Sequence, residues 1–282
     1  MERRGDVMDF SLAQDKTVLV AKNFRNYLAT LELLKVLEEK FGIKTKPYSP
    51  EAAFRIVRGR KLLNREYKPL GKVTFAGDKD VGYAIYAGGK RIGRAALVEG
   101  ELLLQREKDL EPEELRAVHK LFEDIRDLYH RTLDFVVTEK ITEIANFYFK
   151  KLGMLPLRPE RGDFYLLEDS EKLRDFMKTI EDMNLSSGAP PCFILLKLEP
   201  SAIKLVRLSV QERLSSLWKR LESPGESACF FNNIVIEARS LLRGLSTVGK
   251  YIFTDEERET FQGELKLLIK TAKEKSKRGG KS

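Results

Sequence analysis

The segment 72–107 constrains the fold most strongly, because its apolar residues alternate with polar ones at the two-residue period of β-strands. Its four runs, KVTFAG, VGYAIYAGG, KRIGRAALVEG and ELLLQRE, are separated by Gly-Asp, Gly-Gly and Glu-Gly pairs that favour tight turns. This pattern predicts an antiparallel β-meander. Amphipathic helical patterns precede and follow it, so we expect an α+β fold in which the meander and hairpins pack with amphipathic helices.

The order of these patterns predicts three consecutive regions. Residues 1–108 form an N-terminal α+β region with a basic helix and the β-meander. Residues 109–200 form a central α/β region of helix, hairpin, helix and strand, and residues 201–282 form a helical C-terminal region with a disordered basic tail. With 42% hydrophobic residues among 282, the chain can bury a core, which excludes global disorder.

Hydrophobic period and cap residues predict further elements. A short strand is expected at 18–21, and one helix with an apolar stripe is expected over 24–41. The run PCFILLKLEP (191–200) predicts a buried strand. Ser209 and Glu212 form a capping-box pattern, which predicts that a helix begins there.

The cysteines and the lack of long apolar stretches indicate the cellular compartment. Cys192 and Cys229 are far apart without metal-type spacing, so we expect both to be reduced, as is typical of a cytoplasmic protein. The N-terminus has no apolar run of signal-peptide length, and no stretch approaches the roughly 18 apolar residues of a membrane span. We therefore expect no membrane partner.

The positive charge is concentrated in two blocks. Seven basic residues and one acidic residue occupy 54–72, and six basic residues and one acidic residue occupy 270–282, so the remainder of a chain with net charge +8 is acidic. Such blocks commonly bind polyanions through attraction and the release of counterions. The alternative is a solvated face together with a soluble tail.

The segment KKLGMLPLRPERGDFYLLED (150–169) predicts a third basic feature, a hairpin that follows the end of a helix. Lys150 and Lys151 lie at the helix end, and Arg158 and Arg161 flank the turn. A basic hairpin tip is typical of a wing that contacts a nucleic-acid backbone, because arginine donates two parallel hydrogen bonds to phosphate. The alternative is structural, since cations at a helix C-terminus stabilise the helix without a ligand.

Strand alternation gives opposite directions to the next two residues, Phe164 and Tyr165. One is expected in the core, which leaves the other for base stacking. Together the basic features predict phosphate contacts with weak sequence specificity and strong salt dependence. The predicted contact residues are Arg55, Arg58, Arg60, Lys61, Lys150, Lys151, Arg158, Arg161, Lys277 and Arg278.

Catalytic motifs are incomplete. GLSTVGKY (244–251) resembles a phosphate-binding loop, but its last residue is tyrosine, which cannot supply the small hydroxyl that holds magnesium. Asp78 and Asp80 could share a metal ion, yet a Gly-Asp hairpin turn is the simpler explanation. His119 and His130 lie opposite the apolar stripe of a predicted helix, which favours a solvated face. We predict no cofactor, metal site or catalytic residue, and the sequence leaves enzymatic activity open while favouring a protein that is not an enzyme.

The segment NFYFKKLGMLPLRPERGDFYLLEDSEKLRDFMKTIEDM (146–183) resembles part of a family of uncharacterised viral and plasmid-type proteins. In that family a helix ending in Leu-Gly leads to an LRP sequence, a glycine-centred turn, an aromatic strand and another helix. The family more often has Gly-Gly before the aromatic strand, where this chain has Gly162 and Asp163. The resemblance implies a mobile-element origin and carries no assigned activity, so it transfers no catalytic residue.

Three functions follow from these patterns. The leading one is a nucleic-acid-binding accessory protein of a virus or mobile element. A rival is a self-assembling scaffold protein whose C-terminal helices pack against copies of itself in a homo-oligomer, and exposed apolar residues on those helices would favour it. The third is a metal-dependent nucleotidyl-transfer or nuclease enzyme, which needs a third carboxylate near Asp78 and Asp80.

Overall fold

The computed structural model describes residues 15–59, 70–78, 82–157, 164–186, 190–223 and 227–279. The α+β prediction is confirmed: the protein has an antiparallel meander and a mainly helical C-terminal region. The chain forms two compact units. We call 28–137 the meander unit, and the described residues of 1–27 and 138–282 the bundle unit. The bundle unit is therefore discontinuous in sequence, which differs from the three consecutive regions expected.

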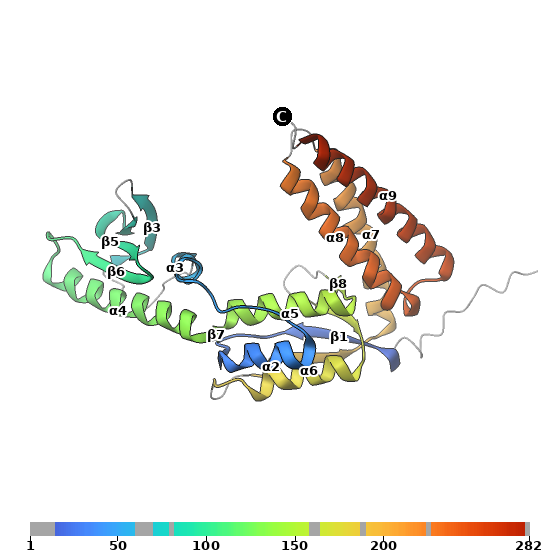
Figure 1. Cartoon of the computed structure of the whole chain (residues 1–282), viewed down its shortest axis with the longest axis horizontal. Helices are drawn as coiled ribbons and strands as arrows, with labels where there is room; N and C mark the ends of the chain where they lie inside the picture. Colours follow the sequence, from blue (N-terminus) through green and yellow to red (C-terminus); the bar gives the residue numbers. More distant parts are fainter. Residues whose placement is uncertain are drawn as a thin grey trace, which may run out of the picture. The chain divides into compact units, whose positions relative to one another are not determined.

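The meander unit contains the predicted four-stranded antiparallel sheet, with strand order β3-β4-β5-β6 (Figure 1). The β4–β5 turn uses Gly88 and Gly89 at positive φ, 57° and 86°, where glycine is favoured. The elements of this unit are β2 (Leu28–Thr30), α2 (Glu32–Phe41), α3 (Pro50–Gly59), β3 (Val73–Asp78), β4 (Gly82–Ala87), β5 (Lys90–Val98), β6 (Glu101–Arg106), α4 (Pro112–Asp134) and β7 (Phe135–Val137).

Helix α4 packs against the meander and shares its core. Ile85 of β4 and Leu121 of α4 are fully buried in one cluster. The hydroxyl of Tyr129 donates to the backbone oxygen of Gly100 at 2.5 Å, which satisfies a polar group in a fully buried side chain. These contacts attach α4 to the meander.

The bundle unit contains a second antiparallel sheet, with strand order β10-β1-β9-β8. The predicted pairing of the two hairpin strands is confirmed, because β8 pairs with β9. The elements of this unit are β1 (Thr17–Lys22), α5 (Thr138–Leu152), β8 (Leu155–Leu157), β9 (Phe164–Glu168), α6 (Glu171–Asp182), β10 (Phe193–Lys197), α7 (Pro200–Glu222), α8 (Ala228–Thr247), the 3-10 helix η2 (Gly249–Tyr251) and α9 (Asp255–Gly279).

The two faces of this second sheet are covered by different helices. On one face, the ring of Tyr165 lies 5.6 Å from the ring of Phe149 in α5, and Phe193 lies 6.4 Å from Phe176 in α6. The next residue of β9, Leu166, points to the opposite face because side chains alternate along a strand. Leu166 belongs to the core cluster that α7, α8 and α9 form. The sheet thus lies between two layers of helices.

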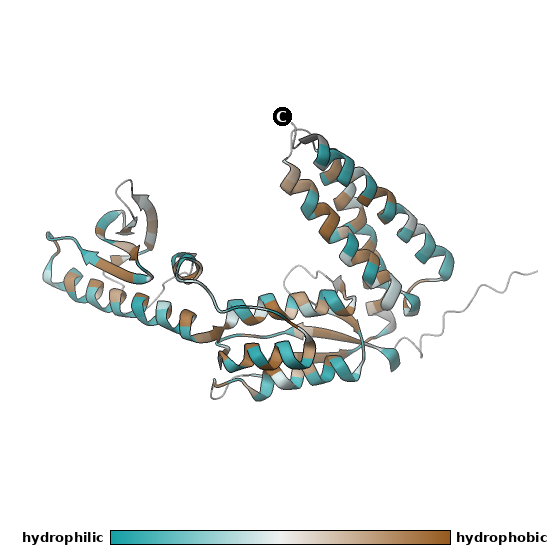
Figure 2. Cartoon of the chain, in the orientation of Figure 1, coloured by the Kyte–Doolittle hydropathy of each residue, from teal (hydrophilic) through white to brown (hydrophobic). Residues whose placement is uncertain are grey.

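Helices α7, α8 and α9 form a three-helix bundle with a continuous apolar core (Figures 1 and 2). The start of α9 is fixed by a capping box. The backbone N–H of Thr254 donates to the Glu257 carboxylate at 2.9 Å, and the N–H of Glu257 donates to the Thr254 hydroxyl at 3.2 Å. Among the described residues, no helix has both the length and the apolar character needed to cross a bilayer.

The prediction of one helix over 24–41 is wrong for its first part. Helix α2 begins only at Glu32, after the short strand β2. Tertiary contacts within the bundle unit determine the conformation of the first part of this segment instead of its helical pattern. The hydroxyl of Tyr27 donates to the backbone oxygen of Ile180 at 3.0 Å. The ring of Phe24 meets the ring of Phe193 edge-on at 5.2 Å. Both aromatic side chains are satisfied by distant partners rather than by one helix face.

Two further expectations are wrong. The strand predicted as buried, β10, is an edge strand with a neighbour on one side only, and Ile194, Leu195 and Leu196 are 46%, 49% and 42% exposed. The helix expected to begin at Ser209 begins at Pro200, because proline suits the first helical position, where no N–H donor is needed.

We predict that the two cysteines differ in reactivity. Cys192 is 3% exposed, and burial raises the pKa of its thiol, with a further contribution from Glu181. Cys229 lies exposed on α8. The thiolate is the reactive form of cysteine. An aromatic disulfide reagent should therefore modify Cys229 quickly in the native protein and Cys192 only after unfolding. The Cys229→Ser variant should lose the fast reaction, whereas rapid modification of Cys192 in that variant would contradict this packing.

Candidate nucleic-acid interface

Helix α9 continues through the segment that was expected to be a disordered tail. The expectation does not hold for 273–279, because the helix ends at Gly279. An α-helix turns by about 100° and rises about 1.5 Å per residue, so its lysines at 4-3-4 spacing fall within about 60° of one another over about 16 Å. These four exposed lysines are Lys266, Lys270, Lys273 and Lys277.

Contacts with the bundle hold this lysine-rich part of α9 in place. Ala272 is fully buried. The Lys275 ammonium group donates to the backbone oxygen of Leu221 at 2.7 Å, and the Ser276 hydroxyl donates to that of Ala228 at 3.3 Å. The segment is helical because its apolar and small residues face the core while its other lysines face solvent.

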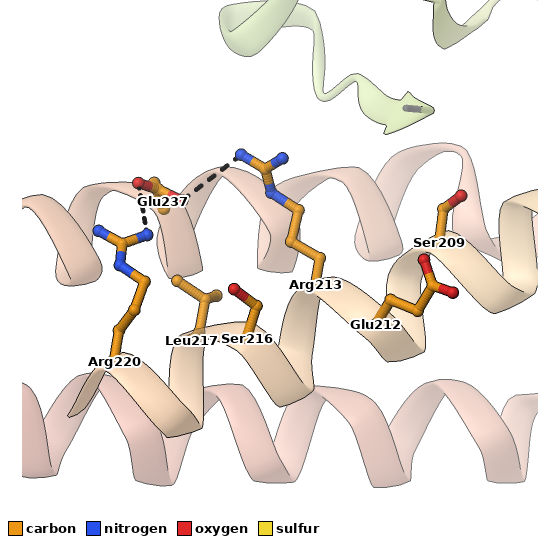
Figure 3. Close-up of a pocket in the computed structure, with 7 residues that line it drawn as sticks. All are labelled: Ser209, Glu212, Arg213, Ser216, Leu217, Arg220 and Glu237. Atoms are coloured by element: carbon orange, nitrogen blue, oxygen red, sulfur yellow. Dashed lines mark hydrogen bonds and ion pairs between the residues drawn. The ribbon is translucent and has the colours of Figure 1, made fainter. Parts of the chain in front are cut away.

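Helix α8 contributes two exposed arginines, Arg239 and Arg243. The only acidic residue of α8 is Glu237, and both of its oxygens bind arginines of α7. One oxygen lies 3.0 Å from Arg220 Nη1 and the other lies 3.4 Å from Arg213 Nη2 (Figure 3). These three side chains line a groove of about 250 Å³ between the two helices. The charge of the Glu237 carboxylate is thus offset by two arginines of α7. The side of α8 that carries Arg239 and Arg243 therefore stays basic.

Hydrogen bonds between α8 and α9 place the arginines and lysines on the same side of the bundle. Gln262 Nε2 donates to the Ser246 hydroxyl at 3.3 Å, and the Ser276 hydroxyl donates to Asn232 Oδ1 at 3.2 Å. Asn232 and Ser246 lie within about 60° of the two arginines around the α8 axis. Gln262 lies within about 40° of Lys266 around the α9 axis. The two arginines of α8 and the four exposed lysines of α9 therefore lie along this row of hydrogen bonds.

Arg243 also connects α8 to the end of α5. Its Nη1 donates to the backbone oxygen of Lys150 at 3.3 Å, and one turn later Thr247 Oγ1 donates to the backbone oxygen of Gly153 at 2.8 Å. Lys150 and Lys151 are exposed at this helix end. We call the combined surface the basic face, which consists of Lys150, Lys151, Arg239, Arg243, Lys266, Lys270, Lys273 and Lys277.

A glycine permits this close approach of α8. A Cβ atom on Gly244 would lie 2.6 Å from the backbone oxygen of Met154 and 2.6 Å from Leu155 Cδ2. Real side chains essentially never make such short contacts, so a larger residue would displace the connection between α5 and β8. Gly244 therefore sets the distance between the α8 arginine and the α5 lysines.

The basic face can hold phosphate groups at several points along one direction. A lysine ammonium group is a compact charge with three donors on a flexible stem, so it contacts phosphate without reading a base. The exposed acids Asp255, Glu256, Glu259 and Glu264 of α9 precede Lys266 in sequence. The stretch 266–277 contains one acid, Glu274, and therefore keeps an excess of positive charge. The arrangement is suited to a polyanion that runs along the bundle.

The predicted residues of the first basic block have different surroundings. Arg55 is exposed on α3. The Arg58 guanidinium lies 3.5 Å from the ring centroid of Tyr83 and 5.2 Å from that of Phe54. Its buried Nε finds no hydrogen-bond partner among the described residues. These contacts give Arg58 a packing role in the meander unit.

Several other predicted residues are not placed. The backbone of Arg278 lies in α9, whereas Arg60, Lys61, Arg158 and Arg161 lie outside the described residues. Neither hairpin aromatic offers a free ring for stacking. Tyr165 is 6% exposed, and Phe164 packs against the core of the bundle.

The weaker catalytic candidates gain no support. Asp78 ends β3 and Asp80 lies outside the described residues, and within the described part of the chain no three His, Cys, Asp or Glu side chains cluster as metal ligands would. The predicted solvated face of α4 is confirmed, because His119 and His130 are exposed. The segment GLSTVGKY forms the end of α8 and η2, as expected for a helix C-terminus and loop.

Sequence reasoning missed five members of the basic face. The 4-3-4 lysine spacing indicates a helical stripe, whereas the composition of the segment indicates a tail. No comparable signal linked the α8 arginines to the α5 lysines, since Arg243 and Lys150 are 93 residues apart. The missed residues are Arg239, Arg243, Lys266, Lys270 and Lys273.

Comparison with known proteins provides no separate assignment. The sequence matches no family model and no curated protein, and the fold matches no solved structure. The geometry and charge of the basic face are therefore the basis for assigning a function.

A pair of glycine substitutions tests the packing that builds this face. Gly244→Ala should lower the free energy of unfolding by about 1–3 kcal/mol, because the added methyl group overpacks the contact with β8. In Gly263→Ala, also within a bundle helix, the added Cβ atom has no other atom within 4 Å. This substitution should raise the free energy of unfolding by about 0.5–1 kcal/mol, because alanine has the higher helix propensity. Urea unfolding followed by circular dichroism measures both, and equal effects of the two substitutions would contradict the close approach of α8.

Proposed function

We propose that this protein binds nucleic acid through the basic face, mainly by contacts with the phosphate backbone. The observation that carries the proposal is the convergence of eight exposed cations from α5, α8 and α9 on one side of the bundle unit. A nucleic-acid backbone presents negative charges at regular short intervals, which a row of lysines on a rigid helix can follow. Binding of this kind is salt dependent and weakly sequence specific.

Basic residues of the predicted hairpin and of α3 are further candidates for phosphate contacts. Arg158 and Arg161 follow β8 in sequence and lie outside the described residues, and Arg55 is exposed on α3. Lys150 and Lys151 fall within 146–183, the segment that resembles viral and plasmid-type proteins. We therefore propose an accessory role for a virus or mobile element, in the cytoplasm, where its nucleic acid is accessible.

Self-assembly is a second candidate, favoured by apolar residues on the bundle. Leu205 and Leu208 of α7 are 60% and 46% exposed, and Ile236 of α8 and Leu267 of α9 are each 56% exposed. Such residues can pack against another copy of the chain. Light scattering separates the possibilities, because a stable mass of 32.4 kDa per particle across a wide concentration range would leave no role for self-assembly.

A matched pair of double variants tests the proposed interface. Lys270→Ala with Lys273→Ala removes two cations from the basic face. Lys172→Ala with Lys178→Ala removes two exposed helical lysines of α6. Fluorescence anisotropy with labelled oligonucleotides should show about tenfold weaker binding for the first variant. The slope of log affinity against log salt should fall by about 1.4–1.8, since each lost phosphate contact removes about 0.7–0.9.

The α6 variant is the control for net charge, and its affinity and salt slope should stay close to those of the original protein. Equal losses in both variants would show that the attraction is a property of total charge rather than of the basic face. Absence of binding to any DNA or RNA at low salt would overturn the proposed function.

A further inference from the structure

We infer that Phe147 stacks on an unpaired nucleobase, so that the basic face selects single-stranded over double-stranded nucleic acid. This inference rests on the proposed function and adds the class of ligand. Phe147 is 55% exposed and is the only exposed Phe, Tyr or Trp side chain among the described residues. The two residues that follow it, Tyr148 and Phe149, are buried, with 3% and 0% exposure.

Phe147 lies next to the cations of α5. Lys150 and Lys151 follow it by three and four residues, so they occupy the next turn on either side of its direction around the helix axis. Helical side chains lean towards the N-terminus, which brings both lysine stems back over the turn of Phe147. The ring therefore stands beside two ammonium groups that can hold the phosphates flanking a stacked base.

The position of α8 extends this arrangement. Arg243 donates to the backbone oxygen of Lys150, so the arginine lies about one helical turn from Phe147. A strand that follows the cations of α8 and α9 would reach α5 at this aromatic ring. A nucleic-acid strand bound along α8 and α9 would therefore meet the Phe147 ring as it passes from these helices to α5.

An exposed aromatic ring followed by two cations favours an unpaired base. The exposed carboxylate one turn before the ring, Glu143, is bound by the Lys140 ammonium group at 3.4 Å. Proteins that bind single strands combine a positive track with aromatic side chains, because every base offers a flat face and stacking tolerates any sequence. In a duplex, the stacked base pairs cover these faces. A single phenyl ring beside the duplex backbone therefore has no base face to stack on. A second copy of this chain fits poorly, since pairing at Phe147 would bring Lys150 and Lys151 towards their counterparts.

The test compares Phe147→Leu, which keeps apolar surface but removes the aromatic ring, with Phe147→Tyr, which keeps the ring. Affinities are measured by anisotropy for a single-stranded oligonucleotide of mixed sequence and for its duplex. We expect Phe147→Leu to weaken single-strand binding about tenfold, as loss of one stacked base would. Phe147→Tyr should retain it, duplex binding should be unaffected, and the salt slope should not change because no phosphate contact is removed.

A second readout follows the base itself. A single strand containing 2-aminopurine should change its fluorescence on binding to the Phe147→Tyr variant and not on binding to Phe147→Leu. If Phe147→Leu leaves single-strand affinity unchanged while the Lys270/Lys273 double variant still weakens it, the inference is wrong and the proposed function stands. If neither the original protein nor any variant binds nucleic acid, both are wrong.

Discussion

The contact of α8 with the end of α5 and the start of β8 determines where the cations of the bundle unit lie. Gly244 lets the backbone of α8 approach β8 without a side chain between them. The Thr247 hydroxyl then binds the backbone oxygen of Gly153, and the Arg243 side chain reaches that of Lys150. Once α8 is fixed in this way, α9 follows through the apolar core they share. The basic face is therefore a consequence of buried packing, although all of its members are exposed.

The distribution of charge around the bundle favours a functional over a stabilising role for these cations. The carboxylate of Glu237 is bound by Arg213 and Arg220 on the α7 side, and it is the only one in α8. The exposed arginines of α8 and the 266–277 stretch of α9 keep an excess of positive charge, and mutual repulsion of this kind lowers the stability of a compact fold. Salt screens that repulsion, so raised salt should support the fold while it weakens contact with a polyanion. A phosphate backbone would relieve the same repulsion directly.

Much of the fold could be predicted from local signals, whereas the site depended on tertiary contacts. The meander, the α4 helix, the hairpin pairing and the Thr254 cap each follow from turn residues, period or capping chemistry within a short segment. The segment 24–41 was misread because Phe24 and Tyr27 have partners elsewhere in the bundle unit. The tail was misread because composition hid the helical spacing of its lysines. The contact of the Arg58 guanidinium with the ring of Tyr83 had no local signal, because Tyr83 belongs to a distant strand. Phe147 falls within a helix whose end at Lys150 and Lys151 is predicted, but only the packed structure shows that its ring is exposed.

The most direct test of the account is lysine footprinting, in which amines are acetylated with and without bound single-stranded oligonucleotide and the modified sites are identified by mass spectrometry. The account predicts that Lys150, Lys151, Lys266, Lys270, Lys273 and Lys277 become protected together, while Lys172 and Lys178 of α6 react at the same rate in both samples. Protection of the α6 lysines, or of the meander unit alone, would contradict the claim that the basic face of the bundle is the nucleic-acid interface.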